Sequence, residues 1–165
     1  MPATIYLDVG QQLRLHNTRG LIMQKFFTAA RLLLGLVFFI FGLNGFFHFI
    51  PQPPMEGPPA AFVGALVASG YLMALVKGVE TVAGFLLLTG RQVPLALTLL
   101  APVIVNILLF HLYLAPAGLA LPIVITLLEI ALAWAWREAF LPLFRVTQPV
   151  RVEKPAIAAH QHAHV

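Results

Sequence analysis

The feature that most constrains this chain is the near absence of charged side chains across its long central part. Between Phe26 and Trp136 the only Lys, Arg, Asp and Glu residues are Arg31, Glu56, Lys77, Glu80, Arg91 and Glu129. Over the whole chain 60% of residues are apolar and 10% are charged, whereas roughly a quarter are charged in an average soluble domain. Such a chain cannot cover itself with a polar surface, so we expect lipid to surround most of it.

The apolar segments have the lengths that membrane-spanning helices require. About 20 mostly apolar residues are needed, because each residue adds about 1.5 Å to a helix that must cross roughly 30 Å of hydrocarbon. Four segments meet this length, at about 26–50, 71–89, 93–114 and 119–140. A short helix at the membrane surface is expected at about 58–68. The sequence therefore predicts an all-α, polytopic membrane protein with a bundle of four transmembrane helices.

The two ends of the chain read differently from the centre. Residues 23–145 are predicted to form the membrane domain, residues 1–22 a disordered extension and residues 146–165 a disordered cytoplasmic tail. Met23 opens a stretch typical of a signal anchor, so a start at Met1 and a start at Met23 both remain open. The tail ends in alternating His160, His162 and His164; a polar tail without metal is favoured over a metal site.

The basic residues predict the orientation in the membrane. Short loops rich in Lys and Arg stay cytoplasmic. In the four-span arrangement the 10 basic residues, Lys77 excepted, lie on one side: Arg14, Arg19, Lys25, Arg31, Arg91, Arg137, Arg145, Arg151 and Lys154. We therefore expect both termini to be cytoplasmic. These residues flank apolar segments and form no stripe, so the lipid bilayer is the expected partner and nucleic acid is not.

Polar side chains inside the predicted spans identify a candidate site. Ionisable groups there cost roughly 3 kcal/mol each on insertion scales, so they normally face the bundle interior. The candidate residues all lie in the half of the spans away from the termini: Asn44, His48, Lys77, Glu80, Asn106, His111 and Glu129. No metal site is predicted from the two histidines.

Lys77 and Glu80 are three residues apart on one helix and are expected to pair. Glu129 has no cation within one turn of its own helix, so it is the better group to exchange a proton. In the predicted site Glu129 and Glu80 exchange protons and Lys77 donates hydrogen bonds, while Asn44, Asn106, His48 and His111 orient a ligand. A purely structural network between helices is the alternative, which is favoured by Gly35, Gly42 and Gly45 of the first span as places where another helix can approach closely.

Several segments together resemble a known family. They are Arg31-Leu32-Leu33-Leu34-Gly35, Phe41-Gly42-Leu43-Asn44-Gly45-Phe46, Lys77-Gly78-Val79-Glu80 and the last span with Glu129. In these segments the chain resembles the DoxX family of small bacterial membrane proteins, over residues 23–145. The resemblance implies a four-helix membrane bundle in the cell membrane of a bacterium, which is the inner membrane where there are two. Some relatives are subunits of a thiosulfate:quinone oxidoreductase, and others associate with thiol and superoxide defence enzymes.

The chain has no cysteine, which excludes disulfides, thiolate metal sites and thiol exchange. Any redox chemistry must therefore belong to a bound quinone or to a partner. The leading hypothesis is a redox-associated membrane subunit that binds a quinone-like or other small ligand, at most a subunit of a quinone-linked oxidoreductase. The alternative is a non-catalytic anchor or assembly factor for a partner enzyme. A redox partner protein and a homo-oligomer are the protein contacts expected under these hypotheses.

Overall fold

The computed structural model describes residues 3–51 and 54–144, and these residues form helices joined by short turns, with no strand. The elements are α1 (Ala3–Phe47), α2 (Gly57–Ala68), α3 (Leu72–Thr89), α4 (Val93–Tyr113), η1 (Pro116–Gly118), α5 (Ala120–Ala135), α6 (Arg137–Phe140) and η2 (Leu141–Phe144). The all-α prediction is confirmed for this part of the chain.

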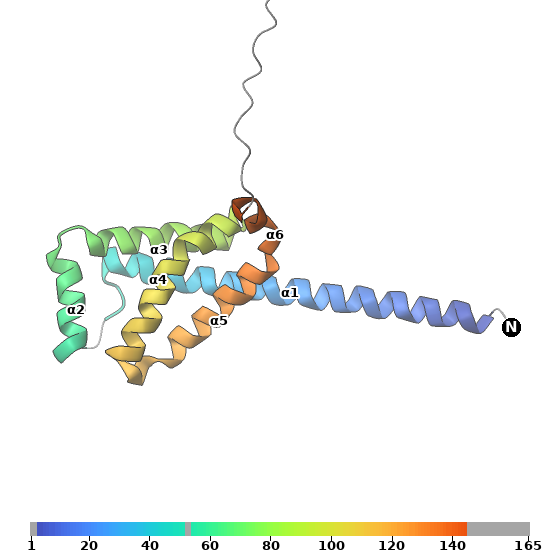
Figure 1. Cartoon of the computed structure of the whole chain (residues 1–165), viewed down its shortest axis with the longest axis horizontal. Helices are drawn as coiled ribbons and strands as arrows, with labels where there is room; N and C mark the ends of the chain where they lie inside the picture. The colour runs from blue at the N-terminus through green and yellow to red at the C-terminus, as the bar shows by residue number, and fades with distance from the viewer. Residues whose placement is uncertain (1–2, 52–53, 145–165) are drawn as a thin grey trace, which may run out of the picture.

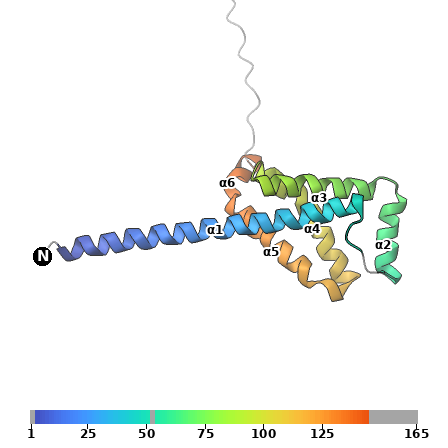
Figure 2. The same cartoon turned by 180° about the vertical axis from the view of Figure 1, so that it is seen from behind.

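The helices are arranged as two pairs with a short helix at one end. The C-terminal half of α1 lies side by side with α3, and the two run antiparallel (Figure 1). The second pair, α4 and α5, forms an inclined hairpin against them. Helix α2 lies across the end where α1 stops and α3 begins, as Figure 2 shows from behind. The bundle therefore has an end covered by α2 and an opposite end near α6.

Within the described residues, three helices are long and apolar enough to cross a membrane: residues Gly20–Phe47 of α1, then α3 and α4. This composition is that of an integral membrane protein. The predicted span at 119–140 needs correction, because α5 ends at Ala135 after 16 residues, a rise of only about 24 Å. The cause is local: the backbone of Trp136 leaves the helical region (φ −101°, ψ 15°) and interrupts the helix before α6.

The first helix is longer than the sequence analysis expected. It begins at Ala3 and has 45 residues, a length of roughly 68 Å. Residues 3–22, expected to be disordered, are part of this helix, since no proline interrupts the sequence from Ala3 to Phe47. Its N-terminal half extends away from the other helices (Figures 1 and 2). The predicted tail at 146–165, with its histidines, lies outside the described residues.

Glycines bring α1 and α3 into close contact, as expected for Gly35 and Gly42. A Cβ at Gly42 would lie 2.6 Å from the backbone nitrogen of Thr81, and one at Gly35 would lie 3.0 Å from that of Leu88. A Cβ at Gly84 of α3 would meet the backbone of Phe39. The two helices therefore pack backbone to backbone along much of α3.

The second pair packs differently. Large aliphatic side chains fill the space between α4, α5 and the first pair, among them Leu97, Leu100, Ile104 and Leu132, all buried. They belong to one hydrophobic cluster with Leu34 and Leu87 of the first pair. The core of the bundle is therefore apolar, and the buried polar groups stand out against it.

Candidate functional site

The central feature of the candidate site is the ion pair between Lys77 and Glu80 on α3. The Nζ of Lys77 donates to Oε2 of Glu80 at 2.7 Å, as the three-residue spacing predicts. The Glu80 side chain is only 4% exposed and that of Lys77 is 23% exposed. The carboxylate thus lies in the core, while the ammonium group retains some access from outside.

The position of Lys77 depends on a glycine in the neighbouring helix. A Cβ at Gly45 of α1 would overlap the side chain of Lys77, whose own Cβ would be 2.9 Å away. Because Gly45 has no side chain, the aliphatic part of Lys77 can lie across α1. The sequence analysis had singled out Gly45 as a place of close helix approach, and the structure shows that Lys77 occupies it.

A cavity of about 290 Å³ lies beside this ion pair and is called the inner cavity below. All four long helices of the bundle contribute to its wall. Its polar residues are Lys77, Glu80 and His111, and its apolar wall includes Phe38, Phe41 and Ile125. The cavity therefore combines a mostly apolar wall with a few convergent polar groups, the usual character of a small-molecule site.

The ring of His111 has a defined hydrogen-bonding role in this wall. Its Nδ1 lies 2.9 Å from the carbonyl oxygen of Ile107. A carbonyl oxygen can only accept, so Nδ1 carries the hydrogen and donates it. In the neutral ring Nε2 is then an acceptor. The wall of the inner cavity thus includes a hydrogen-bond donor, Lys77, and the ring of His111, whose Nε2 lies on the side toward Gly118.

A second hollow, of about 360 Å³, lies under α2 and is called the α2 hollow below. Its polar residues are Asn44, His48 and Lys77, so Lys77 lies in the walls of both cavities. Asn44 is buried, and its amide is engaged with the backbone of Ile50: Oδ1 accepts from the nitrogen at 2.6 Å and Nδ2 donates to the oxygen at 3.3 Å.

These bonds hold the turn after α1, where His48 has a left-handed backbone (φ 52°) and an exposed side chain. Asn44 therefore holds this loop, a role that the sequence analysis did not assign to it. His48 lies at the rim of the α2 hollow and is not part of the inner cavity.

Glu129 lies apart from both cavities. Its side chain belongs to the buried stripe of α5, one turn beyond Ile125, and it lines neither the inner cavity nor the α2 hollow. Its Oε2 is buried and has no hydrogen-bond partner among the described residues. Glu129, which the sequence analysis grouped with Glu80 in one site, therefore lies outside the cavity wall that Glu80 lines.

Asn106 does not take part in the site, which corrects the sequence analysis. It is exposed on the surface of α4 and lines neither cavity. The inward stripe of α4 continues from Ile104 to Ile107 and His111. At about 100° per residue, Asn106 points about 200° away from Ile104.

Sequence reasoning missed the role of Arg31. Its guanidinium is partly buried and donates to the carbonyl oxygen of Leu87 and, at 3.3 Å, to that of Leu88. These carbonyls belong to the last turn of α3, where an unpaired oxygen favours a cation. The position of Arg31 near the start of the predicted span was the only available signal, because its partners are far away in the sequence.

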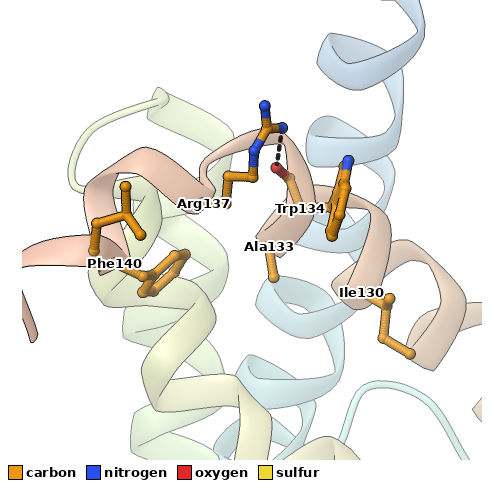
Figure 3. Close-up of a pocket in the computed structure, with 6 residues that line it drawn as sticks. Ile130, Ala133, Trp134, Arg137 and Phe140 are labelled. Carbon is orange, nitrogen blue, oxygen red and sulfur yellow. Dashed lines mark hydrogen bonds between the residues drawn. The ribbon is translucent and has the colours of Figure 1, made fainter. Parts of the chain in front are cut away.

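A third hollow of about 390 Å³ lies near α6 and is open to the surface (Figure 3). Its lining is apolar except for Arg137, whose side chain lies beside the Trp134 ring and donates to the Trp134 carbonyl at 3.2 Å. An exposed Trp beside an Arg at a helix end is typical of a membrane interface. The inner cavity, with its buried ion pair, is the better candidate site.

Comparison with known proteins assigns no function to this arrangement. No family model matches the chain, and neither a curated protein nor a solved structure matches it. The functional conclusion therefore depends on the chemistry of the site: an ion pair, a hydrogen-bond acceptor and aromatic side chains around a cavity within an apolar helical bundle.

Proposed function

We propose that this protein is a redox-associated membrane subunit that binds the head group of a quinone-like ligand in the inner cavity. The observation that supports it most is the position of the Lys77–Glu80 pair in the wall of a cavity otherwise lined by apolar side chains. A charged pair among transmembrane helices is costly and commonly marks a ligand or ion site. The resemblance to the DoxX family in the quoted segments supports the quinone as the ligand.

The polar groups of the cavity fit such a head group. Lys77 has three N–H donors, of which one is used by Glu80, so another is free for a ligand oxygen. His111 supplies an acceptor for a ligand hydroxyl, and Phe38 and Phe41 supply aromatic contacts for a ring. A quinone would supply the electron-accepting chemistry that a chain without cysteine lacks. Glu80, in the cavity wall, and Glu129, outside it and one turn beyond Ile125 on α5, are the carboxyl groups proposed to exchange protons during the reaction.

The test is binding of a short-tailed benzoquinone to the purified protein in mild detergent. The variant in which Lys77→Met and Glu80→Leu are combined removes both charges and leaves neither stranded. We expect it to fold and to bind on the order of tenfold more weakly or worse, the effect of losing a charged hydrogen bond. Asn106→Leu, outside the cavity, is the matched control and should bind like the parent. Equal binding by the double variant would remove the ion pair from the site.

The proposal includes a four-span topology with both termini in the cytoplasm. Basic residues support the orientation, and α5 together with η1 and α6 supplies the fourth crossing. A reporter fused after Val165 should be active only as a cytoplasmic form, and one inserted at Gln52 only as a periplasmic form. The opposite result at either site would contradict this topology.

A non-catalytic anchor or assembly factor is the second candidate. One observation favours it: α1 continues far beyond the span that begins at Gly20 and extends away from the bundle. Such a helix offers a surface for a partner enzyme. Mass spectrometry of the protein purified in mild detergent separates the candidates, since a stoichiometric quinone supports the first, and a partner protein without a small molecule supports the second.

A further inference from the structure

We propose that the α2 hollow is a water-filled vestibule that hydrates the Lys77 ammonium group from the α2 end of the bundle. The inference rests on the proposed function in one respect only, namely that the ligand occupies the inner cavity while water reaches Lys77 from the α2 hollow. The vestibule itself is assigned from the walls of the hollow.

The hydrogen bonding of the Lys77 ammonium group is incomplete. Its ammonium has three donors, and the described part of the chain provides one partner, Oε2 of Glu80. In a bilayer the remaining donors cannot find water at the lipid-facing surface. The α2 hollow provides that water, because Lys77 forms part of its wall and is 23% exposed.

The α2 hollow has an exposed rim and a polar inner wall. Its rim is at the surface, where His48, Met55 and Val67 are exposed, and its inner wall contains Asn44 and Lys77. A cavity holds ordered water when it has polar partners and room. At about 360 Å³ the hollow has room for several water molecules. No carboxylate lines it in the described structure, so the ammonium is its only full charge.

Helix α2 covers one side of the α2 hollow. Val63 and Val67 of α2 line the hollow, and Phe62 of the same helix packs against Phe110 of α4 with ring centroids 5.5 Å apart. The cover is thus fixed at both α3 and α4 and separates the hollow from lipid. Water therefore enters past the turn held by Asn44 and not through the side of the bundle.

The experiment uses the absence of cysteine, which gives single-cysteine variants a clean background. Met73→Cys places a thiol in the wall of the hollow, one turn before Lys77. Leu75→Cys, two residues away, places one on the outer face, where Leu75 is 58% exposed. Both proteins are reconstituted in phosphatidylcholine vesicles without quinone and treated with a charged, membrane-impermeant methanethiosulfonate reagent added to both sides.

We expect Met73→Cys to react faster by on the order of tenfold, although Leu75 is the more exposed of the two, because thiolates and charged reagents need water. Adding Val63→Trp should fill the hollow and slow the reaction at position 73 while leaving position 75 unchanged. Equal rates at the two positions, whether fast or slow, would overturn the vestibule, as would an unchanged rate with Val63→Trp. Because quinone is absent, a fast reaction at position 73 stands even if the ligand proposal fails.

Discussion

The two helix pairs of the bundle handle polar groups in opposite ways. In the first pair, Lys77 and Glu80 of α3 form an ion pair, and Arg31 of α1 donates to carbonyl oxygens at the end of α3. Between α4, α5 and the rest, Glu129 is buried with an oxygen that has no partner among the described residues. The polar groups of the first pair thus have partners, within α3 for Lys77 and Glu80 and across the two helices for Arg31, whereas in the second pair a buried oxygen of Glu129 has none among the described residues.

The backbones differ in the same sense. Glycines let α1 and α3 approach until their main chains touch, while α4 and α5 contact their neighbours through large aliphatic side chains. A buried group that forms no bond costs stability and persists where it serves another purpose. In the proposed function, Lys77 and Glu80 of the first pair line the ligand cavity, and the unpartnered carboxyl of Glu129 in the second pair is the group proposed to exchange a proton.

The largest effect is expected when the ion pair of the first helix pair is broken on one side. Glu80→Leu leaves the Lys77 ammonium without its carboxylate and should lower the free energy of unfolding in detergent by roughly 3 kcal/mol. Adding Lys77→Met should restore most of it, since the stranded charge is gone. Denaturant titration of the single and double variants measures both. A double variant as unstable as Glu80→Leu alone would show that shape, and not charge pairing, dominates here.

A smaller loss of stability is expected when a side chain is added at the close contact between α1 and α3. In Gly84→Ala the new Cβ would lie 2.8 Å from the Cα of Phe39, which is backbone and cannot rotate away. The helices must separate, at a cost of roughly 2 kcal/mol. Gly78→Ala on the same helix is the control, because nothing lies within 4 Å and alanine favours a helix by roughly 0.5–1 kcal/mol. Similar thermal stability of the two variants would argue against backbone contact.

The smallest change in the free energy of unfolding is expected in the second pair, where the substitution should stabilise the protein or leave its stability unchanged. Glu129→Leu removes a buried carboxyl oxygen that lacks a partner and should leave stability unchanged or raise it by about 1 kcal/mol. Benzoquinone binding should persist, since Glu129 does not line the inner cavity. Proton uptake on reduction of the bound benzoquinone should slow with both Glu129→Leu and Glu129→Gln. A strongly destabilised Glu129→Leu protein would mean that this carboxyl stabilises the packing of α5 against its neighbours.

What could be predicted from the sequence was local in character. The Lys77–Glu80 pair follows from a three-residue spacing on a helix, and Gly35, Gly42 and Gly45 indicated close packing before any partner was known. The orientation of Asn106 could not be derived, because α4 is apolar on every side and no pattern shows which face turns inward. The early end of α5 at Trp136 likewise left no proline or glycine in the sequence to mark it.

Two sets of hydrogen bonds from side chains to the backbone were also beyond the sequence. Arg31 donates to Leu87 and Leu88, more than fifty residues away, and Asn44 holds the turn at Ile50 where a role in ligand binding was expected. Both are side chains that satisfy backbone groups left open at a helix end or in a turn. The partners of Arg31 depend on how α1 and α3 meet, and those of Asn44 depend on the path of the turn after α1; neither is encoded in the spacing of residue types along the chain.

The bond from Arg31 to the end of α3 has a consequence for biosynthesis. Helix α1 leaves the ribosome before α3. The Arg31 guanidinium therefore has no carbonyl partner until α3 has been made and the chain has turned at Gly90. Until then we expect Arg31 to stay in the lipid head groups and hold α1 shallow in the membrane. Docking of α3 then satisfies the charge in one register only, since a slip of one turn, about 5.4 Å, would carry the guanidinium away from both carbonyls. The arginine thereby selects the vertical alignment of the first two spans as they are inserted.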